Sequence, residues 1–154
     1  MSTTAYVDAS HAGCRVTRRS HTGVIIFVNR APIVWYSKRQ NTVEASTFGS
    51  EFIAMKVAVE LIQALRYKLR MFGIPVDGAT SVLGDNQSVV VNVTAPESTL
   101  KKKHLSIAYP RCREASASRM VIVGYVPSKE NLADLATKVL PPITRQKLVR
   151  MILW

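Results

Sequence analysis

Four acidic side chains lie in separate short contexts where a carboxylate could hold a metal ion. Asp8 and Asp85 each follow an apolar run of strand type, whereas Glu51 and Asp134 lie in the first turns of segments with a helical apolar pattern. A carboxylate against an apolar element is costly to desolvate unless a positive charge compensates for it. Several such carboxylates together would need cations, and all-oxygen ligand sets suit Mg²⁺ or Mn²⁺. This combination suggests a metal-dependent nuclease.

Each of these acids also has a simpler interpretation. Asp8 could begin a turn, and Glu51 could be an acid favoured by the dipole at a helix N-terminus. Asp85 and Asn86 could form a helix cap, and Asp134 could be an ordinary exposed helical acid. If the four acids converge, two metal ions about 3.5–4 Å apart could bind the attacking water and the leaving oxygen of a phosphodiester. Spacing alone leaves both interpretations open.

Composition limits the class of protein. The chain has 154 residues, 47% of them hydrophobic, which predicts one domain with a substantial core. Lys and Arg number 21 against 10 acids, a formal charge of +11. This excess favours a polyanionic partner, most simply nucleic acid, although a basic surface without a specific ligand is the alternative.

The chain shows no sign of a membrane or secreted protein. No apolar run approaches the roughly 20 residues needed to span a bilayer, and no cleavable signal is visible. Cys14 and Cys112 lie far apart and lack the spacing of a zinc site or a disulfide framework. These features predict an intracellular chain with reduced cysteines and no membrane partner.

The first half of the chain predicts three strands followed by a long helix. Apolar, β-branched runs indicate strands at 3–7, 23–28 and 33–37, with a polar, basic loop at 9–21. These three strands suit an antiparallel meander. The helix begins after a Ser46 or Thr47 cap, and its apolar residues recur every three or four positions before Gly73.

The second half alternates strands and helices. We expect a strand at 80–83, a helix at 86–93, then a helix pair or a helix bent around Pro110. A strand at 120–126 precedes the helix that carries Asp134 and ends near residue 141, and a final short helix covers 143–154. The order predicts an α/β domain with a mixed sheet, in which Asp8 and Asp85 lie at strand ends that line a ligand crevice.

Several short motifs follow one another between residue 5 and about residue 140. They are 7–9 with 12–13, 18–23, 32–40, 46–47 with 51–54, 85–88, 102–104 and 133–138. In this order, they make the chain resemble the ribonuclease H domain of Ty1/copia-type retrotransposon polyproteins. The resemblance implies a ribonuclease H-like fold, a five-stranded mixed sheet flanked by helices, over residues 1–140. Residues 141–154 would then form a C-terminal basic helix or tail.

The resemblance also implies an activity. Asp8, Glu51, Asp85 and Asp134 match the family's metal-binding catalytic carboxylates. They would hold two Mg²⁺ or Mn²⁺ ions and hydrolyse the RNA strand of RNA–DNA hybrids during reverse transcription. A polymerase domain of the same polyprotein is expected upstream. Whether the setting is a cytoplasmic particle or the nucleus is not distinguished.

Four positions depart from the family pattern. Gly49 and Ser10 stand where many relatives have acids, and Pro110 and Tyr125 stand where histidines are common. None of them removes one of the four matched carboxylates. The departures keep two alternatives open: a catalytically decayed nucleic-acid-binding remnant, and a structural fragment that is inert without its polymerase domain.

Basic and amide side chains near these motifs are candidates for binding the hybrid. Such a duplex is recognised through its shape, phosphates and 2′-hydroxyls rather than its base sequence. The lysine run could instead be a solvated helix start, and the two amides could simply cap a helix. The candidates are Arg15, Arg18, Arg19, Lys38, Arg39, Asn86, Gln87, Lys101, Lys102, Lys103 and His104.

Overall fold

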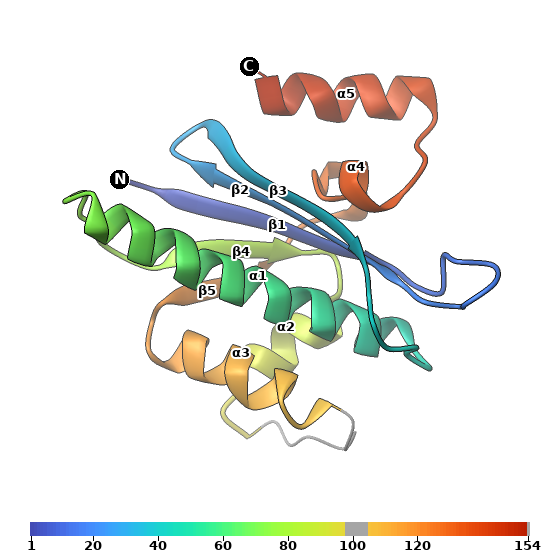
Figure 1. Cartoon of the computed structure of the whole chain (residues 1–154), viewed down its shortest axis with the longest axis horizontal. Helices are drawn as coiled ribbons and strands as arrows, with labels where there is room; N and C mark the ends of the chain where they lie inside the picture. Colours follow the sequence, from blue (N-terminus) through green and yellow to red (C-terminus); the bar gives the residue numbers. More distant parts are fainter. Residues whose placement is uncertain (98–104, 154) are drawn as a thin grey trace.

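A computed structural model of the chain describes residues 1–97 and 105–153. Its centre is a five-stranded mixed sheet in the order β3-β2-β1-β4-β5, with helices on both faces (Figure 1). The strands are β1 (Thr3–Ser10), β2 (His21–Val28), β3 (Ala31–Arg39), β4 (Thr80–Gly84) and β5 (Val121–Tyr125). The predicted fold class, a five-stranded mixed sheet flanked by helices, is confirmed.

The direction of the strands brings distant residues to one edge. β1 pairs with β2, and β2 with β3, in antiparallel fashion, which is the expected meander. β4 is parallel to both β1 and β5. The last pair between β1 and β4 joins Val7 to Gly84. The next residues along the two strands, Asp8 and Asp85, are therefore neighbours.

Three helices cover one face of the sheet: α1 (Thr47–Met71), α2 (Gln87–Thr94) and α3 (Ala108–Ala117). The Ser46 hydroxyl caps α1 by accepting a hydrogen bond from the Gly49 N–H. The apolar stripe of α1 then packs on the sheet through side chains such as Phe52 and Ile62, which are fully buried. This packing places the first turns of α1 near the carboxyl ends of β1 and β4, and its later turns near the start of β4, where Arg66 donates a hydrogen bond to the Thr80 hydroxyl.

The opposite face carries α4 (Asp134–Thr137) and α5 (Pro142–Leu153), as Figure 1 shows. Leu148 of α5 is buried against Ile25 and Phe27 of β2 and against Leu132, forming a second small core. The C-terminal segment thus contributes to covering the sheet. Its division from the rest at residue 141 stays a prediction. No helix in the described part of the chain is long and apolar enough to cross a membrane.

Three features of the helices and strands differ from expectation. β1 continues to Ser10 because Ala9 and Ser10 pair with the start of β2. Pro110 does not bend a helix, since it lies in the first turn of α3, where a backbone N–H has no intrahelical partner. The helix that carries Asp134 is a single turn ending at Thr137 instead of near residue 141, whereas α5 agrees with the predicted final helix.

Candidate metal centre

Three of the four predicted acids meet at the carboxyl ends of β1 and β4. Asp8, Asp85 and Asp134 each offer a carboxylate oxygen, and these oxygens lie within 4.8 Å of one another. Asp8 and Asp134 are buried, and Asp85 is half-buried. The parallel register of β1 and β4 supplies the first two, and the single turn of α4 supplies the third. The cluster is a set of oxygen ligands suited to a hard divalent cation.

Glu51 approaches the same edge from α1, although it lies outside that 4.8 Å set. Its carboxylate accepts a hydrogen bond from the Ala9 backbone N–H. Burial, followed by the negative charges of Asp8 and Asp85, raises the pKa of Glu51 to about 9. The ionised form of Glu51 is therefore unfavourable beside Asp8 and Asp85 unless a cation compensates for its charge.

Lys138 is a site residue that the motif analysis did not assign a role. Its Nζ lies 3.2 Å from Asp8 Oδ1 and 2.8 Å from Asp134 Oδ1. Burial lowers the pKa of Lys138, but the Asp134 and Asp8 carboxylates outweigh that effect and raise it to about 12. Its spacing of four residues from Asp134 on a predicted helix was the available signal. Asp8, 130 residues away, could not be inferred as its second partner.

Two further contacts hold α4 against the sheet. The Thr137 hydroxyl donates a hydrogen bond to Asp8 Oδ2. The fully buried Asn131 donates its amide to the Val7 carbonyl at 2.9 Å and accepts the Ala133 N–H at 3.1 Å. The segment entering α4 is thus attached to β1 directly before Asp8, so the positions of Asp8 and Asp134 are coupled.

Gly23 of β2 allows α4 to approach the sheet closely. A Cβ at this position would lie 2.5 Å from Thr137 Cγ2 and 2.8 Å from the Ala133 carbonyl oxygen. Such distances are shorter than real Cβ contacts, so any larger residue would push α4 outward. Gly23 is also the partner of Asp8 across the β1–β2 ladder. It therefore positions Thr137, Lys138 and Asp134 relative to Asp8.

The structure shows what occupies the space beside Gly49, one of the departures from the family pattern. A Cβ on Gly49 would lie 2.5 Å from a carboxylate oxygen of Glu44, which is 6% exposed. The space beside Gly49 is thus filled by the acid of Glu44, and the Thr42 hydroxyl donates to that carboxylate at 3.2 Å. Sequence analysis did not single out Glu44.

The predicted nucleic-acid contacts fall into four groups. The arginines at 15, 18 and 19 lie in the loop between β1 and β2. Lys38 and Arg39 are exposed at the end of β3 and line a cavity of about 350 Å³ together with Lys56 of α1. Asn86 caps α2 by accepting the Val89 N–H. Gln87 is exposed on the first turn of α2, and Lys101, Lys102, Lys103 and His104 lie outside the described residues.

Comparisons with known proteins agree with this geometry. No family model matches the chain. It is 28% identical, over 148 residues, to the retrovirus-related Pol polyprotein of transposon RE2 from Arabidopsis thaliana. It is 31% identical, over 137 residues, to the corresponding polyprotein of transposon TNT 1-94 from Nicotiana tabacum. The alignments cover 96% and 88% of this chain but 10% of each polyprotein, so the chain spans about a tenth of these relatives.

The fold comparison adds a solved structure. The crystal structure of LC11-RNase H1 in complex with an RNA/DNA hybrid superposes with a TM-score of 0.66, at 18% identity. The match covers 88% of this chain and 93% of that one. The chain is a ribonuclease H-fold domain related to the Pol polyproteins of copia-type retrotransposons. The resemblance seen in the sequence motifs is thereby confirmed, and this ribonuclease H-fold domain carries Asp8 and Asp85 at strand ends, Glu51 on α1 and Asp134 on α4.

Proposed function

We propose that this ribonuclease H-fold domain hydrolyses the RNA strand of RNA–DNA hybrids, as part of reverse transcription by a retrotransposon polyprotein. The observation that carries the proposal is the convergence of Asp8, Asp85 and Asp134 from three separate elements. Glu51 completes the set, and burial, followed by the charges of Asp8 and Asp85, raises its pKa. The structure of LC11-RNase H1 with an RNA/DNA hybrid supports the choice of substrate.

The residues present fit Mg²⁺ or Mn²⁺ as cofactor. Every donor at the edge is a carboxylate oxygen, and the charge of Lys138 alone does not balance the acids. We assign Asp8, Glu51, Asp85 and Asp134 as the groups that would hold two such ions. When bound, the ions supply an activated water and stabilise the leaving oxygen of a phosphodiester.

The protein's own groups orient this machinery. Thr137 and Lys138 donate hydrogen bonds to the two oxygens of the Asp8 carboxylate and so fix its orientation. The Ala9 N–H favours the ionised form of Glu51 and so lowers its pKa, against the larger effect of burial. Lys38, Arg39 and Lys56 surround the neighbouring cavity and would bind phosphates of the hybrid. A polymerase domain in the same polyprotein remains a proposed partner.

A cleavage assay on a labelled RNA–DNA hybrid, with millimolar Mg²⁺ or Mn²⁺, tests the proposal. Asp85→Asn removes one ligand charge at constant shape and should abolish cleavage while leaving hybrid binding unchanged or tighter. Asp77→Asn is the matched control, since it makes the same chemical change at an exposed residue between α1 and β4. Cleavage by Asp85→Asn at the wild-type rate would refute the proposed mechanism.

A decayed binding module is the second candidate, and Lys138 is the observation in its favour. Its ammonium already bridges Asp8 and Asp134, as a cation would. On this alternative the domain binds hybrid through its basic surface and never cleaves it. Wild-type protein that binds hybrid with a steep salt dependence, yet shows no cleavage with either metal, would favour the binding module.

A further inference from the structure

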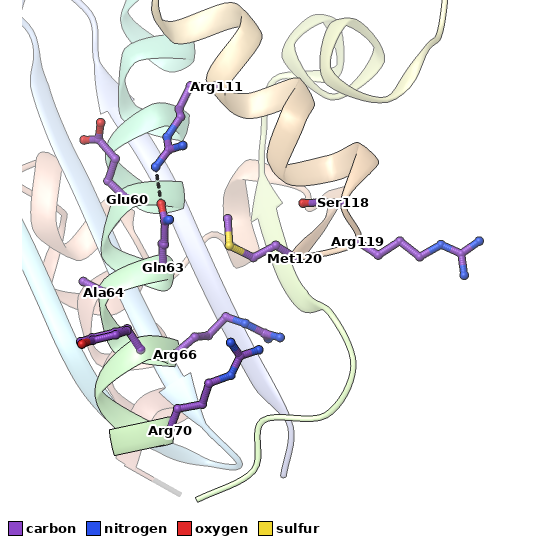
Figure 2. A pocket seen from close by; sticks show the side chains of 10 residues that line it. Glu60, Gln63, Ala64, Arg66, Arg70, Arg111, Ser118, Arg119 and Met120 are labelled. Carbon is purple, nitrogen blue, oxygen red and sulfur yellow. Dashed lines mark hydrogen bonds between the residues drawn. The ribbon is translucent and has the colours of Figure 1, made fainter. Parts of the chain in front are cut away.

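A second basic site lies at the other end of α1, away from the carboxylates. A cavity of about 680 Å³ opens between the C-terminal half of α1 and the end of α3. Four arginines line it: Arg66 and Arg70 from α1, Arg111 from α3, and Arg119 just after α3 (Figure 2). No motif in the sequence pointed to this site, and the proposed cleavage chemistry does not use it.

The cavity has more positive charge than its own residues neutralise. Glu60 is the one acid in its lining, and it already pairs with Lys56 at 3.4 Å. Arg111 pairs with Glu114 of α3 at 3.6 Å, which leaves Arg66, Arg70 and Arg119 without an acidic partner among the residues that the structure describes. Among the described residues, the side chains of Arg70 and Arg119 have no hydrogen-bond or ion-pair partner. The cavity as described is therefore suited to an anion.

Two of the arginines are held in place. Arg66 donates hydrogen bonds to the carbonyls of Gly78 at 2.9 Å and Val76 at 3.4 Å. Arg111 donates to Gln63 across the contact between α3 and α1, marked by the dashed line in Figure 2. Burial, and then the charge of Arg70, lower the pKa of Arg66. Preorganised guanidinium groups bind phosphates with less entropy loss than free side chains do.

The position of the cavity favours nucleic acid over other polyanions. Lys56, Glu60, Gln63 and Tyr67 recur at helical spacing, so they lie along one face of α1. Lys56 also lines the cavity beside Lys38 and Arg39, and α3 borders both cavities. Lys56 and the arginines Arg66 and Arg70 therefore place basic side chains at two points along α1, one beside each cavity. Arg66 lies 15 residues beyond Glu51, or about 22 Å along the helix.

We propose that the arginine cavity between α1 and α3 binds the phosphate backbone of a nucleic acid at a second point, about six or seven base pairs from the metal centre. The inference rests on the proposed function for the identity of the nucleic acid, an RNA–DNA hybrid. The arginine cavity would then be a second binding site that determines the length of duplex bound beside the cleavage site.

The test compares two double variants that each remove two positive charges. Arg70→Gln with Arg111→Gln alters the cavity, and Arg145→Gln with Arg150→Gln alters exposed positions of α5 on the opposite face. Binding of an 18-base-pair RNA–DNA hybrid is measured across salt concentrations without divalent metal. We expect the cavity variant to bind roughly tenfold more weakly at physiological salt and to lose about two from the log–log salt slope. The α5 variant should bind the hybrid less than threefold more weakly than the wild type does.

The single variant Arg70→Gln keeps the test valid if loss of the Arg111–Gln63 contact disturbs folding. It should weaken binding about threefold and reduce the salt slope by about one. Equal losses in the cavity and α5 variants would overturn the inference. Poly-glutamate binding that the cavity variant abolishes, with hybrid binding unchanged, would assign the cavity to an acidic protein instead. A wild-type domain that never cleaves, but shows the cavity-specific loss, would refute the proposed function and leave this inference standing.

Discussion

The two ends of α1 carry opposite chemistry. At its first turns, Glu51 joins three aspartates in a cluster with too much negative charge. Toward its end, Arg66 and Arg70 join two more arginines in a cavity with too much positive charge. The acids are coupled by buried contacts among separate elements, whereas two of the arginines, Arg70 and Arg119, are exposed and the other two are half-buried. Stability and metal binding at the acidic end should therefore respond to small structural changes. Nucleic-acid binding at the basic end should respond to salt concentration.

The largest expected effect is on the acidic end, through pH. The folded protein holds a proton on Glu51 up to a pKa of about 9, whereas the ordinary value is 4.5. Between those values the folded state binds more protons than the unfolded state, so stability falls as pH rises, by at most about 1.4 kcal/mol per pH unit. Urea denaturation in EDTA from pH 5 to 9 measures this dependence.

Glu51→Gln should flatten that dependence, and Glu60→Gln should not. Glu60 is an acid of the same helix at the basic end, so it is a matched control. Identical pH profiles for wild type and Glu51→Gln would show that the acidic end is not electrostatically strained.

The next effect comes from the packing of α4. Gly23→Ala should destabilise the domain by about 1–3 kcal/mol, because the new methyl overlaps Thr137 and the Ala133 carbonyl. Stabilisation by Mg²⁺ should also weaken as Asp134 moves away from Asp8. Gly124→Ala on β5 is the control, since its methyl would meet only the end of the Leu83 side chain, at 3.2 Å. Equal denaturation midpoints for the two variants would contradict the role given to Gly23.

A smaller effect is expected from Lys138→Met, which removes the cation between Asp8 and Asp134. We expect a loss of about 1–2 kcal/mol without metal, reduced from the cost of breaking a fully buried pair because Lys138 is more than one third exposed. Millimolar Mg²⁺ should narrow the difference from wild type. Lys147→Met on α5 should change neither the stability without metal nor the effect of Mg²⁺ on it. A loss that Mg²⁺ leaves unchanged would mean that Lys138 acts through packing rather than charge.

The smallest effect is the response of the wild-type protein to metal. At a Mg²⁺ concentration ten times its Kd, binding stabilises the folded state by about 1.4 kcal/mol, which raises the Tm by about 3–5 °C. Asp85→Asn should reduce this shift, whereas Arg70→Gln at the basic end should keep it. Differential scanning calorimetry measures both, and an absent wild-type shift at neutral pH would contradict a formed metal centre.

The sequence predicted most of the helices and strands and the four candidate acids. The Ser46 cap and the apolar period of α1 depend on residues within a few positions of each other, so they could be identified. Asp8 and Asp85 could be placed together because parallel strands bring their ends to one edge. The order of motifs then indicated Glu51 and Asp134.

The remainder depends on contacts between distant residues. The extension of β1 to Ser10 requires pairing with β2, and the short α4 is fixed by packing against Gly23 rather than by its own apolar pattern. The second bond of Lys138 and the arginine cavity likewise combine segments far apart in the chain. Periodicity gives no information about such pairs.

The hydrogen bond from Asn131 to the Val7 carbonyl has a consequence for the order of events during synthesis. It joins positions 124 residues apart, and Asp134 and Lys138 follow directly after it. A nascent chain can form the β1–β2–β3 meander early, but its acid cluster lacks a member until residues 131–138 leave the ribosome. Cation binding to the complete acid cluster should therefore begin only after residues 131–138 have folded onto β1.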